Sequence, residues 1–153
     1  MTPGRLLGID HGLARIGLAV SDATGLVARE LAVIKRASKV EDFAKINRIA
    51  AEQGVVGVVI GLPSNRDLPP GVYSQADKVR HWVNQFAATT DLPIVLWDEQ
   101  MTSVDAQALS RQKGRGVREP IDDLAARVIL QSYLDAVRDG MASLPGSPDS
   151  ASF

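Results

Sequence analysis

The chain has 153 residues, and its 17 Lys and Arg against 18 Asp and Glu give a formal net charge of −1. Hydrophobic residues make up 45% and charged residues 23%, which is typical of a folded globular domain and excludes a disordered polyelectrolyte. The absence of cysteine excludes disulfides, thiolate zinc sites, iron–sulfur clusters and cysteine nucleophiles, and fits a cytoplasmic location. We expect neither a membrane span nor a signal peptide. Because the overall charge is balanced, a nucleic-acid partner has to be argued from local clusters.

The first third of the chain predicts three strands and a helix. Apolar runs predict strands over 4–10, 15–21 and 26–35, the first two forming a hairpin around Gly12. Apolar residues at helical spacing predict a helix over 40–53, which Gly54 would end.

The rest of the chain alternates strands and helices. We expect strands over 55–60 and 93–97, and helices over 72–86, 103–112 and 121–138. Three consecutive strands followed by strand–helix alternation predict an α/β domain with a mixed sheet, an order that the ribonuclease H-like arrangement satisfies along with other α/β folds. The domain would span residues 1–139, and the Gly-, Ser- and Pro-rich segment 140–153 is expected to be a disordered tail.

Three acidic residues follow or begin elements that should be central. Asp10 ends the first apolar run, Glu99 follows the strand over 93–97, and Asp122 opens the last helix. Open α/β sheets place their sites outside the carboxyl ends of strands. Carboxylates meeting there would repel one another unless a cation is bound, and oxygen ligands suit Mg²⁺ or Mn²⁺. Such ions can assist phosphodiester hydrolysis.

Simpler interpretations of the same acids remain open. Asp10 before Gly12 can be a turn former. Asp122 and Asp123 follow Pro120 in the first turn of a helix, where acids favour the macrodipole. The pair Asp98–Glu99 can be ordinary solvated charge, and spacing alone does not show that the acids converge.

Four basic residues fall within eight positions, at the end of the helix predicted over 103–112 and in the loop after it, without an acid among them: Arg111, Lys113, Arg115 and Arg118. This loop is either an exposed charged segment or a phosphate clamp beside the acids. Arg15, just past the first turn, could reach the same place. His11 adjoins the acids, and His81 is expected at the surface; neither has a metal-ligand partner at a useful spacing.

Four segments in order resemble the YqgF/RuvX family of candidate Holliday junction resolvases. They lie between about residues 5 and 135, and each alone is a weak signal: LLGIDHGLARIGLAVSD (6–22), VVIGLPSN (58–65), LPIVLWDEQMTS (92–103) and EPIDDLAARVILQSYLD (119–135).

The resemblance implies a ribonuclease H-like fold with a five-stranded mixed sheet, and a metal-dependent nuclease linked to processing the 5′ end of pre-16S rRNA. It carries the family's catalytic and metal-binding acids to Asp10, Glu99 and Asp122. Two departures stand out: Gln100 replaces the family Arg after the Asp-Glu pair, and Leu68-Pro69-Pro70 replaces the usual Gly in the segment after Gly-Leu-Pro.

Other functions remain open at this point. A Holliday junction resolvase would act on branched DNA and require a two-fold homodimer, but no interface is readable from the sequence. A non-catalytic nucleic-acid-binding module would keep the basic residues and lose the chemistry. An actin-like phosphotransferase would need two such domains, more than this length supplies.

Overall fold

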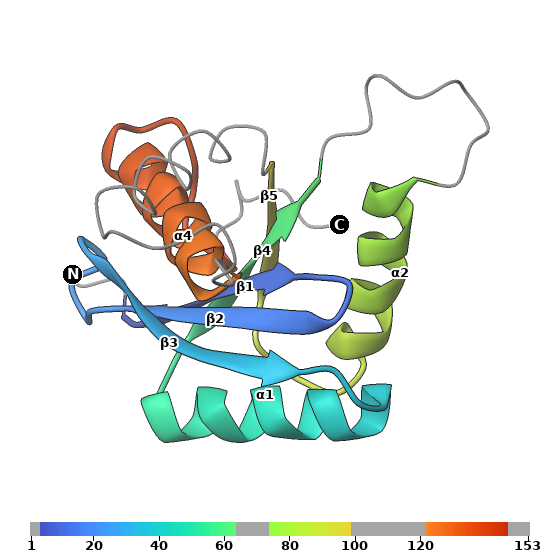
Figure 1. Cartoon of the computed structure of the whole chain (residues 1–153). Helices are drawn as coiled ribbons and strands as arrows, with labels where there is room; N and C mark the ends of the chain where they lie inside the picture. The colour runs from blue at the N-terminus through green and yellow to red at the C-terminus, as the bar shows by residue number, and fades with distance from the viewer. Residues whose placement is uncertain (1–3, 64–73, 99–121, 147–153) are drawn as a thin grey trace, which may run out of the picture.

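Five strands form a single sheet in the order β3-β2-β1-β4-β5 (Figure 1). The computed structural model describes residues 4–63, 74–98 and 122–146. The strands are β1 (Leu6–His11), β2 (Arg15–Ser21), β3 (Ala28–Lys35), β4 (Gly57–Leu62) and β5 (Ile94–Asp98). The pairs β1–β2 and β2–β3 are antiparallel, whereas β1–β4 and β4–β5 are parallel. The predicted α/β fold with a five-stranded mixed sheet is confirmed.

Three helices flank the sheet in the described residues: α1 (Lys39–Gln53), α2 (Gln75–Ala87) and α4 (Asp122–Arg138). Ser38 caps α1 by accepting a hydrogen bond from the Glu41 amide, and Gly54 ends the helix with a φ of 64°. The helix predicted over 103–112 lies outside the described residues. None of the helices that the structure describes is both long and apolar enough to cross a membrane.

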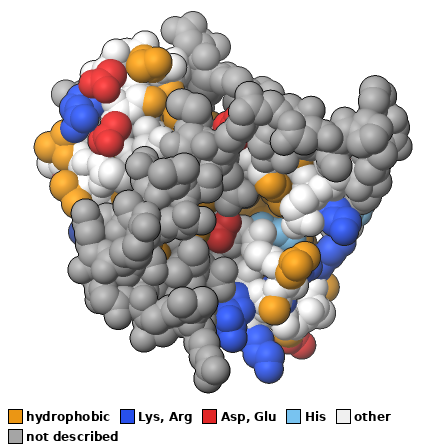
Figure 2. Space-filling model, turned by 45° about the horizontal axis from the view of Figure 1, so that its top comes forward, with side chains coloured by type: hydrophobic (Ala, Val, Ile, Leu, Met, Phe, Trp, Pro, Cys, Tyr) orange, Lys and Arg blue, Asp and Glu red, His pale blue; other side chains and the backbone are white. Residues whose placement is uncertain are grey.

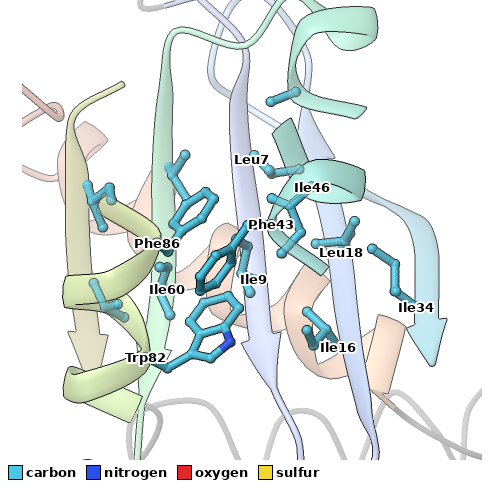
Figure 3. Close-up of a cluster of buried hydrophobic side chains, with 14 of the residues drawn as sticks. Leu7, Ile9, Ile16, Leu18, Ile34, Phe43, Ile46, Ile60, Trp82 and Phe86 are labelled. Atoms are coloured by element: carbon cyan, nitrogen blue, oxygen red, sulfur yellow. The ribbon is translucent and has the colours of Figure 1, made fainter. Parts of the chain in front are cut away.

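One face of the sheet is covered by α1 and α2 (Figure 1). Alternate residues of β1, such as Leu7 and Ile9, point into this layer because side chains alternate between the faces of a strand. Figure 3 shows Ile9 beside Phe43 of α1 and Trp82 of α2 and Leu7 beside Ile46 of α1, and Phe86 stacks on the tryptophan. This larger core holds most of the buried aromatic surface and fixes the sheet on one side.

The other face is covered by α4, which comes unusually close to β1. A Cβ atom built on Gly8 would lie 2.8 Å from the Leu130 Cβ atom and 3.1 Å from the Ala126 carbonyl oxygen. Glycine is therefore required by close packing rather than by backbone angle, and it sets how near α4 lies to the sheet.

Residues 140–146 belong to the folded domain, although the sequence predicted a tail from residue 140. The Tyr133 hydroxyl donates a hydrogen bond to the Ser143 carbonyl oxygen, and Ala142 packs on the α4 core. A Cβ atom on Gly57 would lie 3.0 Å from the Pro145 Cβ atom, so this segment returns to the start of β4. Residues 147–153 lie outside the described part, where the tail stays a prediction.

We expect Gly8→Ala to destabilise the protein by about 1–3 kcal/mol, the usual cost of an extra methyl group in a well-packed core. The added carbon would have to displace Leu130 or the α4 backbone. Urea denaturation followed by circular dichroism measures the change in the unfolding midpoint. An unchanged midpoint would show that α4 can shift without cost.

Candidate nuclease site

The carboxyl ends of three parallel strands meet at one edge of the sheet. In register, Ile9 of β1 pairs with Ile60 of β4, and Ile60 pairs with Leu96 of β5. Asp10 and Asp98 therefore lie at the same edge, on either side of β4. Glu99, the next residue along the chain, lies outside the described residues, so its place in the site stays a prediction.

Asp10 faces the α4 side of the sheet. Gly8 meets α4, and Asp10 is two residues further along β1, so strand alternation directs both to the same face. Asp10 is partly buried, whereas Asp98 is exposed. Asp10 therefore lies at the end of β1, on the sheet face that α4 covers, and stays partly exposed to solvent.

The direction of α4 points its first residue toward the same edge. The Ala28 amide at the start of β3 donates to the Gln131 side chain at 2.8 Å. Further along β3, the Glu30 carboxylate pairs with Arg127 at 3.4 Å. The helix α4 therefore runs antiparallel to β3. Because β3 and β1 run in the same direction, the N-terminus of α4 lies toward the carboxyl end of β1. Asp122 begins α4; its side chain and that of Asp123 lie outside the described part.

Of the predicted phosphate-binding residues, the structure describes Arg15. It is exposed at the start of β2 and is the cross-strand partner of Lys35. Figure 2 shows a face of the molecule on which an acidic side chain and a histidine lie close together, with Lys and Arg side chains along its margins. The other four predicted residues lie outside the described residues: Arg111, Lys113, Arg115 and Arg118.

The described residues supply one partly buried carboxylate at this edge, of the kind that a hard divalent cation prefers. Asp10 offers carboxylate oxygens, the ligands that Mg²⁺ and Mn²⁺ prefer. Within residues 4–63, 74–98 and 122–146, no group of three or more His, Asp or Glu side chains is gathered that could hold a metal ion. A complete metal site therefore depends on the predicted contributions of Glu99 and Asp122.

His11 turns away from Asp10, toward α1 and α2. Its ring lies 4.7 Å from the Trp82 ring, centroid to centroid. In the described part of the chain, both imidazole nitrogens and the Trp82 indole nitrogen are buried without a hydrogen-bond partner. Burial, and then the nearby Arg36 guanidinium, lower the pKa of His11 to about 4. The sequence placed His11 beside the acids but gave no sign that it packs on the opposite face.

Comparison with known proteins agrees with this geometry. The family described as RuvX, Holliday junction resolvase, matches residues 4–136. The chain belongs to the RuvX family. The predicted family and a phosphodiester-hydrolysing nuclease activity are thereby confirmed, and the matched region includes all three predicted acids.

Relatives and solved structures extend the match over nearly the whole chain. A candidate pre-16S rRNA nuclease of Thermoanaerobacter pseudethanolicus is 40% identical over 139 residues, covering 88% of this chain and 99% of that protein. Its counterpart in Chloroflexus aggregans is 38% identical over 142 residues, covering 91% and 99%. The structure of T. thermophilus RuvC with a Holliday junction substrate aligns with a TM-score of 0.62 at 17% identity, covering 90% and 97%. This last likeness shows a shared fold.

We expect stability to fall as the pH drops from about 6.5 toward 4, because His11 takes up a proton in the unfolded chain before it can do so in the fold. Between pH 7 and 5 the loss should be about 1–2 kcal/mol, allowing for partial solvent screening of the ring. Urea denaturation across this range measures it.

A His11→Phe variant keeps an aromatic ring against Trp82 and removes the titration. Its free energy of unfolding should change less between pH 7 and 5 than that of the wild type. Asp22 does not interfere in this range, because a hydrogen bond from the Thr24 hydroxyl helps to lower its pKa to about 2. The same slope in both proteins would contradict a neutral, buried His11.

Proposed function

We propose that this protein is a metal-dependent endonuclease whose physiological substrate is the 5′ end of pre-16S rRNA. The observation that carries the proposal is the meeting of β1, β5 and the start of α4 at one sheet edge, where Asp10 is partly buried. The curated names of its relatives support the choice of substrate.

Asp10, Glu99 and Asp122 would hold the metal. A bound Mg²⁺ or Mn²⁺ supplies a Lewis acid for the phosphate and lowers the pKa of a bound water molecule. The chain has to supply anionic oxygen ligands in a fixed position, and Asp10 meets this need because it sits on a central strand rather than on a loop.

The remaining task is to hold the phosphodiester backbone against the acids. Carboxylates repel a polyanion, so cationic side chains beside them are needed for binding. Arg15 is exposed at the start of β2, next to the turn that follows β1. Its guanidinium can bind a phosphate with two parallel hydrogen bonds, which would orient the strand over the sheet edge.

Cleavage of branched DNA is the second candidate function, and the fold favours it. The RuvC structure to which this fold is similar was solved in complex with a Holliday junction substrate. A matched panel of pre-16S rRNA fragment, single-stranded RNA, single-stranded DNA and a four-way junction separates the two. Preferential cleavage of the junction would replace the ribosomal substrate.

We expect Asp10→Asn to reduce Mn²⁺-dependent cleavage by more than about a hundredfold, the scale of removing one strong electrostatic interaction from a transition state. Asparagine keeps the size of the side chain but removes the charge that a hard cation requires. Cleavage of a labelled pre-16S fragment measures the rate, and gel shift in EDTA measures binding, which should persist.

The control is Asp91→Asn, a change of the same kind at an exposed residue that precedes β5, at the opposite edge of the sheet. It should leave cleavage unchanged. If Asp10→Asn cleaves at the rate of this control, Asp10 is a turn former and not a catalytic residue.

Replacing Lys113 and Arg115 by Ala should weaken nucleic-acid binding and lower the slope of log affinity against log salt by up to about one for each phosphate that is no longer bound. The reason is the acid-free basic run that contains them. Binding titrations at several salt concentrations give the slope. An unchanged slope would identify the loop as ordinary solvated charge.

A further inference from the structure

Two cations face each other at the ends of β2 and β3. Arg15 and Lys35 are directly opposed cross-strand partners, and both are exposed. Directly opposed side chains have Cβ atoms about 4.5–5.5 Å apart, and like charges at that spacing destabilise the sheet. Within the described residues, neither side chain makes an ion pair, whereas Arg127, Arg48 and Arg138 all do. An anion bound between Arg15 and Lys35 would therefore stabilise this end of the ribbon.

Two further cations extend the pair toward α1. Arg36 follows Lys35 directly, and Lys39 is the first residue of α1 and is exposed. Neither of them makes an ion pair in the described part of the chain. Four cationic residues thus gather around one end of the β2–β3 ribbon, with Arg15 and Lys35 on the Asp10 face and Arg36 and Lys39 toward α1, which covers the opposite face.

The β1–β2 turn next to these cations carries an exposed apolar tip. Leu13 is 80% exposed. Its turn is firmly braced, because the Arg36 guanidinium donates to the Leu13 carbonyl oxygen at 3.0 Å and to the Gly12 carbonyl oxygen at 3.1 Å. The Arg36 amide also donates to the Ala14 carbonyl oxygen at 2.9 Å. Because the backbone of this turn is already fixed, Leu13 can contact a binding partner without the entropy cost of ordering a flexible loop.

The cation pair lies on the same side of the sheet as Asp10. Asp10 pairs with Gly17 of β2, two residues from Arg15, so Arg15 shares the face of Gly17 and Asp10. Strand spacing and rise place the Cα atom of Asp10 about 8 Å from that of Arg15 and about 12 Å from that of Lys35. These distances let one continuous anionic chain contact Asp10 and then both cations.

We propose that the ends of β2 and β3 form a second nucleic-acid contact, the ribbon surface, made by Leu13, Arg15, Lys35 and Lys39. The cations bind successive phosphates of the strand that leaves the cleavage site, and Leu13 contacts a base or sugar beside them. Apolar side chains with this role are known in proteins that unstack bases. The inference rests on the proposed nuclease function and adds the path of the substrate, as well as Leu13, Lys35 and Lys39.

The arrangement fits a phosphodiester backbone better than an acidic protein segment. Its cations gather around one end of the ribbon beside an apolar tip, and a nucleic acid presents a row of charges with apolar bases beside it. Arg36 uses its guanidinium to brace the turn, so its removal would confuse binding with folding. Lys35 and Lys39 are therefore the residues to change.

The test compares two double variants in the full chain. Lys35→Ala/Lys39→Ala removes two charges from the ribbon surface. The control, Arg29→Ala/Arg48→Ala, removes two exposed charges from the far end of β3 and the second half of α1, and Arg48 makes only an exposed ion pair with Glu52 at 3.9 Å. Binding is measured in EDTA, at several salt concentrations, to labelled single-stranded RNA, DNA of the same sequence and a four-way junction. Urea denaturation checks that both variants remain folded.

We expect the Lys35/Lys39 variant to bind about tenfold or more weakly, with a salt slope lower by about one to two, and the control to bind like the wild type. Leu13→Ala should weaken binding at an unchanged salt slope, whereas Met141→Ala, equally exposed at 80%, should not weaken binding.

Equal affinity and slope in both double variants would overturn the ribbon surface, even if the wild type binds and cleaves. Failure of the wild type to bind any probe would overturn the proposed nuclease function itself. Weaker binding of the Lys35/Lys39 variant to an acidic peptide, but to none of the three nucleic acids, would overturn the proposal and assign the surface to a protein partner.

Discussion

The close approach of α4 to β1 at Gly8 is the constraint on which the rest of the site depends. No side chain separates the strand from the helix there, so the position of Leu130 is set by contact with backbone. Because α4 is rigid and runs against the direction of β1, this one contact also fixes where its first residue, Asp122, begins. If Asp122 is a catalytic acid, its position is set by the contact between Gly8 and Leu130, about two helical turns away along α4.

One face of the sheet carries the main apolar core, and the other face carries the charged residues of the candidate site. The face under α1 and α2 is almost wholly apolar and carries the aromatic cluster of Phe43, Trp82 and Phe86. The other face carries Asp10, Arg15 and Lys35 beyond the reach of the α4 core. A register slip of one residue in β1 would turn Asp10 into the apolar layer under α1 and α2 and turn Ile9 toward the α4 face, so the apolar core is also what keeps the acid in the site.

Sequence patterns predicted the elements well and the tertiary details poorly. Apolar spacing placed the start of the second helix at Val72, but α2 begins after Ser74, because Ser74 and Asp77 form a capping box that is itself visible in the sequence. The return of Pro145 to Gly57 depends on contacts across the fold and leaves no local signal. Asp10 could be picked out because it ends a buried run, whereas the pairing of Arg15 with Lys35 follows from strand register, which the sequence does not give directly.

His11 follows Asp10 in the sequence, and a protonated imidazole beside Asp10 would compete with a metal ion for its carboxylate. Asp10 and His11 are neighbours in sequence, but alternation sends them to opposite faces, and burial against Trp82 keeps the imidazole neutral at physiological pH. A protonated histidine beside Asp10 would stabilise the carboxylate and weaken its attraction for a divalent ion. The neutral ring adds no positive charge next to Asp10. This arrangement has a cost in stability, since the ring nitrogens stay without a partner among the described residues.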